Sequence, residues 1–351
     1  GLLLQDMGRF DEAEVAYRRS LALDPSIEQR AQYNLGLACL CGGKLAEGWA
    51  HHELRFVRSD GAAKRSFPHP AWQGEPLAGK SLLIWGEQGI GDELLFASLF
   101  GETIERADSC VIECAAKLVP LFSRSFPGAQ VVAASNPPHP ATLQSFDFQS
   151  SAGGLARWLR PTLDSFPDRA GYLVPDPDRV AYWRERLDQL GPGLKVGFCW
   201  RSSLLAGTRK LHCTTIDLWG PIFAVPGIHF VNLQYDNCAD ELDDARRRFG
   251  VPLHVFPEVD LFNDLDEAAA LTRALDLVVS APTAASFLAA ALGVPTWMMN
   301  YATAWQTLGT PHLPWFPSMR YYKRLWNQPW EEIIDRVAHD LRESQSSRGN
   351  R

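Results

Sequence analysis

The sequence lacks several features that would place it in a common class. No stretch approaches the roughly 18 uninterrupted apolar residues of a membrane span, and no signal peptide opens the chain. It has no G-x-S-x-G nucleophile elbow and no histidine-rich metal cluster. Positive charge is in deficit, since the formal net charge is −7. Nucleic-acid binders usually carry a net basic surface, so we expect no nucleic-acid partner. Because no long apolar stretch is present, we also expect no membrane span.

The cysteines also lack a pairing pattern. There are seven, an odd number, and three of them lie in apolar runs typical of strands. This usage favours a reducing compartment, and we expect a cytoplasmic protein. Cys110 and Cys114 have the spacing of half a metal site, but no second Cys/His pair follows, so buried strand thiols are the preferred interpretation. The D-x-D run Asp176-Pro-Asp178 lies between prolines and is a poor metal–nucleotide site, so no metal cofactor is expected.

A helical repeat is present near the N-terminus. Gly8, Ala13, Tyr17 and Leu21 have the spacing of the second helix of a tetratricopeptide repeat, and a similar pattern returns about 35 residues later, close to that repeat's usual period. Residues 1–57 are therefore expected to form an all-α tetratricopeptide-repeat segment, with a plain helical hairpin as the alternative. Because so few repeats cannot bury their own apolar faces, they must dock on another part of the protein. The pattern is already under way at the first residue, so we expect a fragment.

The remainder alternates short apolar runs with helical patterns, which predicts parallel sheets covered on both faces. Residues 58–79 are polar and rich in Pro and Gly, as a linker would be. A Rossmann-like acceptor domain is expected at 80–190, a second Rossmann-like domain that binds nucleotide at 194–328, and a C-terminal helix at 329–345. Ligands of such sheets bind beyond the carboxyl ends of the strands, so we expect a site between two facing sheets. The expected strands are 81–85, 110–114, 131–134, 195–200, 229–234, 253–256, 277–281 and 295–299.

One loop passes from a strand through three glycines into a helix. Gly86, Gly89 and Gly91 allow the backbone to approach a ligand, and a helix N-terminus attracts anions. The spacing is not G-x-G-x-x-G and no Gly-Lys-Ser/Thr follows, so the sequence predicts neither a dinucleotide site, and hence no nicotinamide oxidoreductase, nor a Walker site. Asp92 either caps the following helix or acts as a general base, and these two roles are compatible.

Polar residues follow the strands of the second half. Arg201, Arg209, Lys210 and His212 come after strand 195–200, where cations suit a phosphate leaving group, unless they form a solvated basic loop. Gln234 ends another strand, where it either hydrogen-bonds a nucleotide or is an ordinary surface residue.

A second strand-to-helix elbow contains Pro282, Thr283 and Ala284, whose amides are placed to hold a diphosphate. Tight packing of the small-residue helix 284–292 is the alternative explanation. The run 264–267 resembles a capping box and is interpreted as structural.

Together these motifs resemble a family, the bacterial tetratricopeptide-repeat proteins whose C-terminal part is similar to lipopolysaccharide heptosyltransferases and, more distantly, to O-linked N-acetylglucosamine transferases. The resemblance implies a GT-B fold of two facing Rossmann-like domains behind the repeats. It also implies an inverting, metal-independent transfer from a nucleotide sugar to a protein or glycan hydroxyl. Gly91-Asp92 matches the Gly-Asp that carries the family's base, so Asp92 is the expected catalytic residue. The resemblance rests on the runs 47–56, 72–80, 86–92 and 275–297.

The sequence departs from this family at the second elbow. Many relatives have Asp-Thr there and His four residues later, whereas this chain has Pro282-Thr283 and Phe287. The loss of an acid and an imidazole favours a second hypothesis, an inactive scaffold that binds a protein partner through its repeats. The residues expected to contact the nucleotide sugar are Gly89, Gly91, Arg201, Arg209, Lys210, His212, Gln234, Pro282, Thr283 and Ala284.

Overall fold

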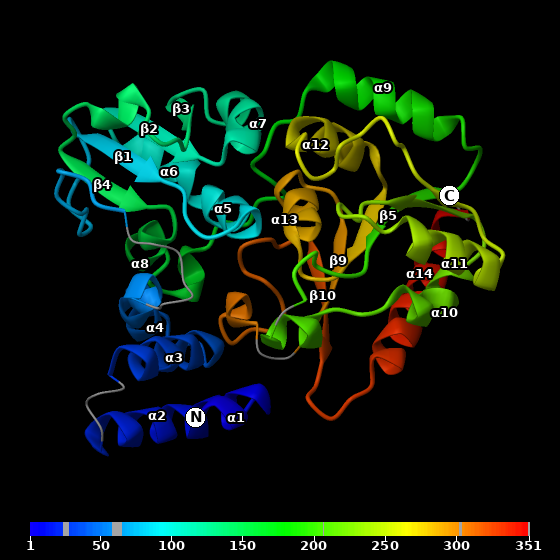
Figure 1. Cartoon of the computed structure of the whole chain (residues 1–351), viewed down its shortest axis with the longest axis horizontal. Coiled ribbons are helices and arrows are strands. Elements are labelled where there is room, and N and C mark those ends of the chain that lie inside the picture. Colours follow the sequence, from blue (N-terminus) through cyan, green and yellow to red (C-terminus); the bar gives the residue numbers. More distant parts are fainter. Residues whose placement is uncertain (24–27, 58–64, 206, 302–303, 350–351) are drawn as a thin grey trace. The chain divides into compact units, whose positions relative to one another are not determined.

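The computed structural model describes residues 1–23, 28–57, 65–205, 207–301 and 304–349. It divides into two compact units, shown in Figure 1: unit 1 is Gly1–Arg169 with Thr303–Pro317, and unit 2 is Ala170–Ala302 with Ser318–Arg351. No helix within these described ranges has both the length and the apolar character that a membrane crossing requires.

Unit 1 begins with a helical segment, which ends in the short 3₁₀ helix η2. A small core around Tyr17 and Leu35 buries α2 against α3. Helices α3 and α4 cross closely because Gly36 and Gly48 have no side chain, and a Cβ on Gly36 would lie 2.6 Å from the Cβ of His51. These helices fit a repeat and a plain hairpin equally well. The elements are α1 (Leu2–Asp6), α2 (Phe10–Leu23), α3 (Glu28–Cys41), α4 (Leu45–His52) and η2 (Glu53–Val57).

The sheet of unit 1 has four parallel strands in the order β3-β2-β1-β4. The first three occupy the predicted positions within a residue or two of each end. The sequence missed β4, because Phe-Gln-Ser-Ser has no apolar run. The strands are β1 (Ser81–Trp85), β2 (Ser109–Cys114), β3 (Gln130–Ala133) and β4 (Phe148–Ser151).

The described part of the expected linker lies along this sheet. The Trp72 amide donates to the Gln149 carbonyl at 2.9 Å, and Ala71 bridges to the same residue. A single bridge at Ala71 therefore joins this segment to the β4 edge of the sheet, while residues 58–64 lie outside the described ranges. The helices of unit 1 that follow are α5 (Ile90–Phe96), η3 (Ala97–Leu99), α6 (Phe100–Arg106), η4 (Ala116–Leu118), α7 (Val119–Ser125), η5 (Pro140–Leu143), η6 (Gly153–Leu155), α8 (Ala156–Leu159), η7 (Leu163–Ser165) and η10 (Trp305–Thr307).

Unit 2 contains a parallel sheet of six strands in the order β10-β9-β8-β5-β6-β7. Counted from β5, this is the doubly wound order 3-2-1-4-5-6. All five expected strands of this half are present, and β10 was missed because its buried residues alternate with Arg and Lys. The strands are β5 (Leu194–Cys199), β6 (Ile228–Asn232), β7 (Leu253–His254), β8 (Leu277–Ser280), β9 (Thr296–Tyr301) and β10 (Met319–Arg324).

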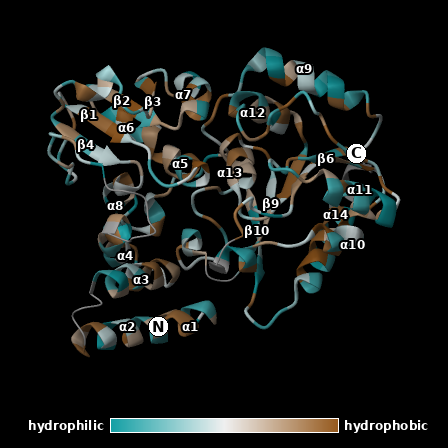
Figure 2. Ribbon diagram, in the orientation of Figure 1, coloured by the Kyte–Doolittle hydropathy of each residue, from teal (hydrophilic) through white to brown (hydrophobic). Residues whose placement is uncertain are grey.

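Helices cover this sheet, and the core beneath them is aromatic, with Phe198, Trp219 and Phe230 buried together. Polar residues of α11 stand out in Figure 2, as expected for a helix with one solvated side. The helices are α9 (Pro177–Asp188), η8 (Gly207–His212), η9 (Ile216–Trp219), α10 (Gly220–Phe223), α11 (Ala239–Phe249), α12 (Leu265–Ala274), α13 (Ala284–Ala291) and α14 (Trp330–Gly349).

The boundary between the units differs from the expected one. Helix α9 was assigned to the first half, yet Glu267 of α12 accepts hydrogen bonds from Arg179 Nε at 2.9 Å and from Trp183 Nε1 at 2.7 Å. These contacts place α9 in unit 2 and also draw Glu267 away from a reciprocal capping box, although Asp264 does cap α12. Residues 304–317 return to unit 1, where Trp305 packs on Trp49 at 5.8 Å. No local sequence pattern indicates these pairings, because they join residues far apart in the chain.

Candidate functional site

Sheet topology indicates where ligands bind in each unit. The strand order reverses at β1, which lies between β2 and β4, and at β5, which lies between β6 and β8. Open parallel sheets bind ligands beyond the carboxyl ends of the strands at such switch points. The rule selects the loop 86–92 in unit 1 and the residues after β5 and β8 in unit 2.

In unit 1, Asp92 lies in the first turn of α5. Gly89 is the N-cap of the helix, and its amide lies 3.4 Å from Asp92 Oδ2. The capping role expected of Asp92 is therefore confirmed, and its half-buried side chain keeps access to solvent. Gly91 lies in the same turn as Asp92 and Glu93, and these two carboxylates occupy the positive end of the helix dipole. This charge disfavours the anion site that we expected at Gly89 and Gly91.

The same loop contains a buried ion pair that the sequence did not reveal. Both carboxylate oxygens of Glu87 accept hydrogen bonds from Arg55, and Oε1 also accepts from the Gly153 amide at 2.7 Å. The next residue, Gln88, has a left-handed backbone with φ 61°. Such strain in a residue other than glycine persists only where the surroundings hold it.

Glu93, in the first turn of α5, is a second buried acid next to this loop. Its carboxylate lies against Gly86, where a Cβ would come within 2.9 Å, and it accepts from the Ala115 amide at 3.0 Å. Burial raises the pKa of Glu93 to about 7, and the nearby charges of Asp92 and Glu87 act in the same direction. The signal available in the sequence was an acid directly after Asp92, in a loop that begins with a glycine.

Replacing Glu93 by glutamine tests this environment. The pKa in the folded state lies above the ordinary 4.5, so stability is lost as the pH rises from about 4.5 to 7, where the unfolded chain ionises first. We expect Glu93→Gln to match the wild type near pH 4 and to be more stable by about 3 kcal/mol near pH 8. Urea denaturation at both pH values measures the difference. Exposed Glu105→Gln is the control, and an equal Glu93→Gln effect at both pH values would contradict the assignment.

In unit 2, Gln234 is buried rather than on the surface, so the surface alternative is wrong. Its amide nitrogen donates to the Arg201 carbonyl at 2.9 Å and to Asp236 at 2.7 Å. Its oxygen accepts from the Cys199 thiol at 3.3 Å, and Cys199 Sγ also lies 3.5 Å from Thr283 Oγ1. A buried polar chain thus joins the ends of β5, β6 and β8.

Thr283 is the N-cap of α13, with a reciprocal capping box to Ser286. Like every helix, α13 has first-turn amides without an intrahelical acceptor, here beginning at Ala284. Pro282 and Ala284 are half-buried, whereas Phe287 is buried at 8% exposure. The elbow therefore offers first-turn amides and carries no charged side chain of its own.

Arg201 does not present its charge as we expected. Its guanidinium forms ion pairs with Asp236 and Glu241, and its side chain is only 14% exposed. These acids hold the pKa of Arg201 above its usual value, the hydrogen bond to Glu241 being the largest cause. No local sequence pattern indicates that acids following β6 neutralise this charge.

Arg209 and Lys210 are exposed in η8, and neither forms an ion pair with any residue in the described ranges. His212 ends the same element, where its Nδ1 lies 2.7 Å from Asn300 Oδ1 of β9. Two of the four expected cations, Arg209 and Lys210, are therefore exposed, while His212 is fixed to the neighbouring strand.

A cleft of about 390 Å³ opens in unit 2 beyond the carboxyl ends of β6 and β7. Gln234 lines it together with apolar groups such as Phe256 and Val259, and with acids such as Asp236 and Asp260. Its size lies within the range of small-molecule sites, and its wall joins apolar surface to hydrogen-bond acceptors.

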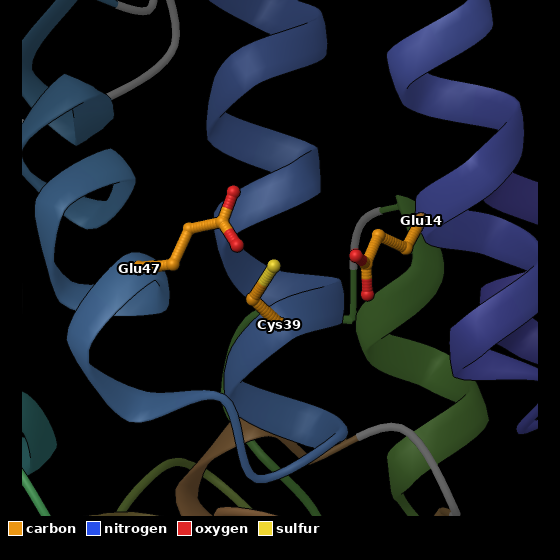
Figure 3. A group of neighbouring side chains, drawn as sticks. All are labelled: Glu14, Cys39 and Glu47. Carbon is orange, nitrogen blue, oxygen red and sulfur yellow. The ribbon is translucent and has the colours of Figure 1, made fainter.

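Figure 3 shows a group of possible metal ligands in the helical segment, Glu14, Cys39 and Glu47. Arg18 donates to both glutamates, and Lys44 donates to Glu14 at 2.6 Å. Burial raises the pKa of the Cys39 thiol to about 12, so the thiol stays protonated. The group is explained as an ion-pair cluster that joins α2 to α4. All seven cysteines of the chain are buried, as predicted for those in strands.

The sequence was compared with family models and with curated proteins. No protein-family model matches the chain. Protein FlbA of Caulobacter vibrioides is 36% identical over an alignment of 360 residues, and this alignment includes 97% of this chain. The chain spans 60% of the length of that relative.

Two solved structures have a TM-score of 0.52 with this chain. The E. coli ADP-heptose LPS heptosyltransferase II is 14% identical, and the match covers 75% of this chain and 99% of that one. The glycosyl transferase family 9 protein of Veillonella parvula is 11% identical, and the match covers 78% and 91%. Several structural neighbours are thus glycosyltransferases. The likeness shows the fold, a mixed α/β architecture with parallel sheets that resembles GT-B enzymes, and the expected fold class is confirmed to that extent.

Proposed function

We propose that the protein is a glycosyltransferase that moves a sugar from a nucleotide-sugar donor to a hydroxyl of a protein or glycan. The observation that carries this proposal is the cleft beyond β6 and β7, which Gln234 links to the elbow at Thr283. A cleft that is joined to a helix N-terminus by such a polar chain suits a nucleoside diphosphate. The fold shared with the heptosyltransferase supports the same assignment.

The cleft suits the nucleoside better than the phosphates. Asp236, Asp243 and Asp260 on its wall supply oxygens that accept hydrogen bonds from ribose hydroxyls, and Phe256 offers apolar surface to a base. Arg246 also lines the cleft, but its charge is paired with Asp243 at 2.7 Å. We place the diphosphate at Thr283 and the first amides of α13, with Lys210 and Arg209 as the available cations. Their exposed charges stabilise the phosphate as negative charge develops on it.

The transfer that we propose is inverting and needs no metal. Asp92 takes the proton of the acceptor hydroxyl, the acceptor oxygen bonds to the anomeric carbon, and the nucleoside diphosphate leaves with the electrons of the broken bond. Donors that act on the leaving group accelerate the reaction because its negative charge is greater in the transition state than in the bound donor. The helical segment, as tetratricopeptide repeats, is proposed to bind a protein partner or acceptor.

The second candidate function is an inactive scaffold. It is favoured by the neutralisation of Arg201 by Asp236 and Glu241, and by Phe287, which places a buried apolar ring near the start of α13. On this hypothesis the cleft binds nucleotide weakly or not at all, and the helical segment α1–α4 binds a protein partner.

Calorimetric titration with ADP, UDP, GDP and the corresponding nucleotide sugars separates the two candidates. We expect one nucleoside diphosphate to bind in the micromolar range, and Lys210→Ala with Thr283→Val to weaken it about tenfold or more, because hydrogen bonds to charged groups are lost. Arg247→Ala is the matched control, since it removes an exposed cation from α11, away from the elbow. No binding at millimolar nucleotide, or equal binding by the double variant, would reject the donor site.

A further inference from the structure

The helical segment ends in an arginine that is buried inside unit 1. Arg55 lies in η2, and its side chain is 2% exposed. Its Nη2 donates to Glu87 Oε1 at 2.7 Å and to Ser151 Oγ at 2.9 Å, and Nε donates to the other oxygen of Glu87. Its Nη1 donates to the carbonyl of His52 and to Glu53, each at 3.0 Å. All five N–H donors of this guanidinium are therefore used.

Such a network is more than is needed to attach one part of a fold to another. Buried ion pairs contribute little net stability compared with apolar residues of similar volume, but they fix geometry, because removing one partner leaves a buried charge. The Glu87 side chain is 1% exposed and is also held by the Gly153 amide. The position of Glu87 is thus set from two sides.

Glu87 belongs to the loop that precedes the candidate base. It is followed by Gln88, whose φ of 61° is strained, and then by the cap and first turn of α5 with Asp92. The far end of α5 also lies near this segment, since the ring of Phe96 is 6.3 Å from His52, although Trp315 and Trp305 are closer at 5.8 and 6.1 Å. The stronger link between the helical segment and α5 is therefore the one through Arg55 and Glu87.

We infer that Arg55 is a positioning residue: through Glu87 it holds the loop 86–92 and places Asp92 for proton transfer. This role rests on the proposed function. It makes the helical segment part of the acceptor side of the site, in addition to any partner that the helices bind.

The test separates positioning from attachment. Arg55→Met leaves Glu87 charged and buried, whereas Arg55→Met/Glu87→Met replaces the whole pair by apolar groups and restores the melting temperature. If Arg55 positions the loop, the double variant still exchanges its amides in 86–92 about tenfold faster than the wild type, with the strands of unit 2 unchanged. Hydrogen exchange followed by mass spectrometry on the full chain gives this readout.

Kinetics give the second readout. With the nucleotide sugar that the wild type uses, we expect the double variant to lose about tenfold or more in kcat while KM for the donor stays constant, because only transition-state geometry is impaired. Arg160→Met is the matched control, since it breaks another buried arginine pair of unit 1, with Glu102, that does not touch the loop.

A stable double variant with wild-type exchange and kcat would overturn the inference. If the wild type turns over no nucleotide sugar, the proposed function fails. Loop exchange then still decides whether Arg55 holds the loop, because it requires no substrate.

Discussion

Asp92→Asn is expected to lower kcat for sugar transfer by about 10²- to 10⁴-fold, the contribution of a general base, while donor affinity stays the same. Asparagine keeps a side-chain oxygen for the Gly89 amide, so α5 retains its cap. What is lost is the carboxylate that takes the proton of the acceptor hydroxyl. Release of nucleoside diphosphate in the presence of acceptor, measured alongside nucleotide binding, separates the chemical step from donor binding.

The control is Asp178→Asn, which removes an exposed acid from the first turn of α9 and should change neither quantity. A near-normal rate for Asp92→Asn would show that the base is another group. Glu93 would then be the next carboxylate to test, since its pKa of about 7 suits proton transfer near neutral pH.

Strand positions were predictable because parallel strands, buried on both faces, need continuous apolar runs. The run at 81–85 matches β1 at both ends. The same reasoning missed β4 and β10, which have no continuous apolar run. These strands form by pairing with β1 and β9, respectively. It also misplaced α9, because the ion pair of Arg179 with Glu267 has no local signature.

For the candidate site, too, the sequence predicts some features and not others. Positions near strand ends followed from the alternation of strands and helices: Gln234 and Thr283 lie just after β6 and β8 as expected, and Asp92 lies in the first turn of the helix that follows β1. The ion pairs near these positions could not be predicted from the sequence. Glu87 pairs with a residue 32 positions earlier, and Arg201 pairs with acids 35 and 40 positions later. Whether a charge is presented to a ligand or neutralised depends on such distant pairs, which a single sequence does not display.

Trp219→Ala is expected to have the largest effect on stability, because the ring fills the centre of unit 2. Trp219 is fully buried, packs on Phe198 and Phe223 at 6.0 and 5.9 Å, and donates from Nε1 to Thr214 Oγ1 at 2.8 Å. Truncation leaves a large cavity and removes one hydrogen bond from the Thr214 hydroxyl, which still donates to the Trp200 carbonyl at 3.2 Å.

We expect Trp219→Ala to destabilise the protein by about 3–5 kcal/mol, and Trp219→Phe by clearly less, because phenylalanine retains most of the packing and loses only the hydrogen bond. Urea denaturation measures the free energy of unfolding of both variants. Repeating it with the nucleotide that binds in the cleft shows whether the cleft unfolds with the core, because a ligand raises stability only where its site unfolds with the core. Trp326→Ala is the control, since that ring is 51% exposed and should cost less than about 0.5 kcal/mol. If Trp219→Ala cost no more than Trp326→Ala, the aromatic core could not be what holds the six strands, and with them the ends of β5, β6 and β8, in register.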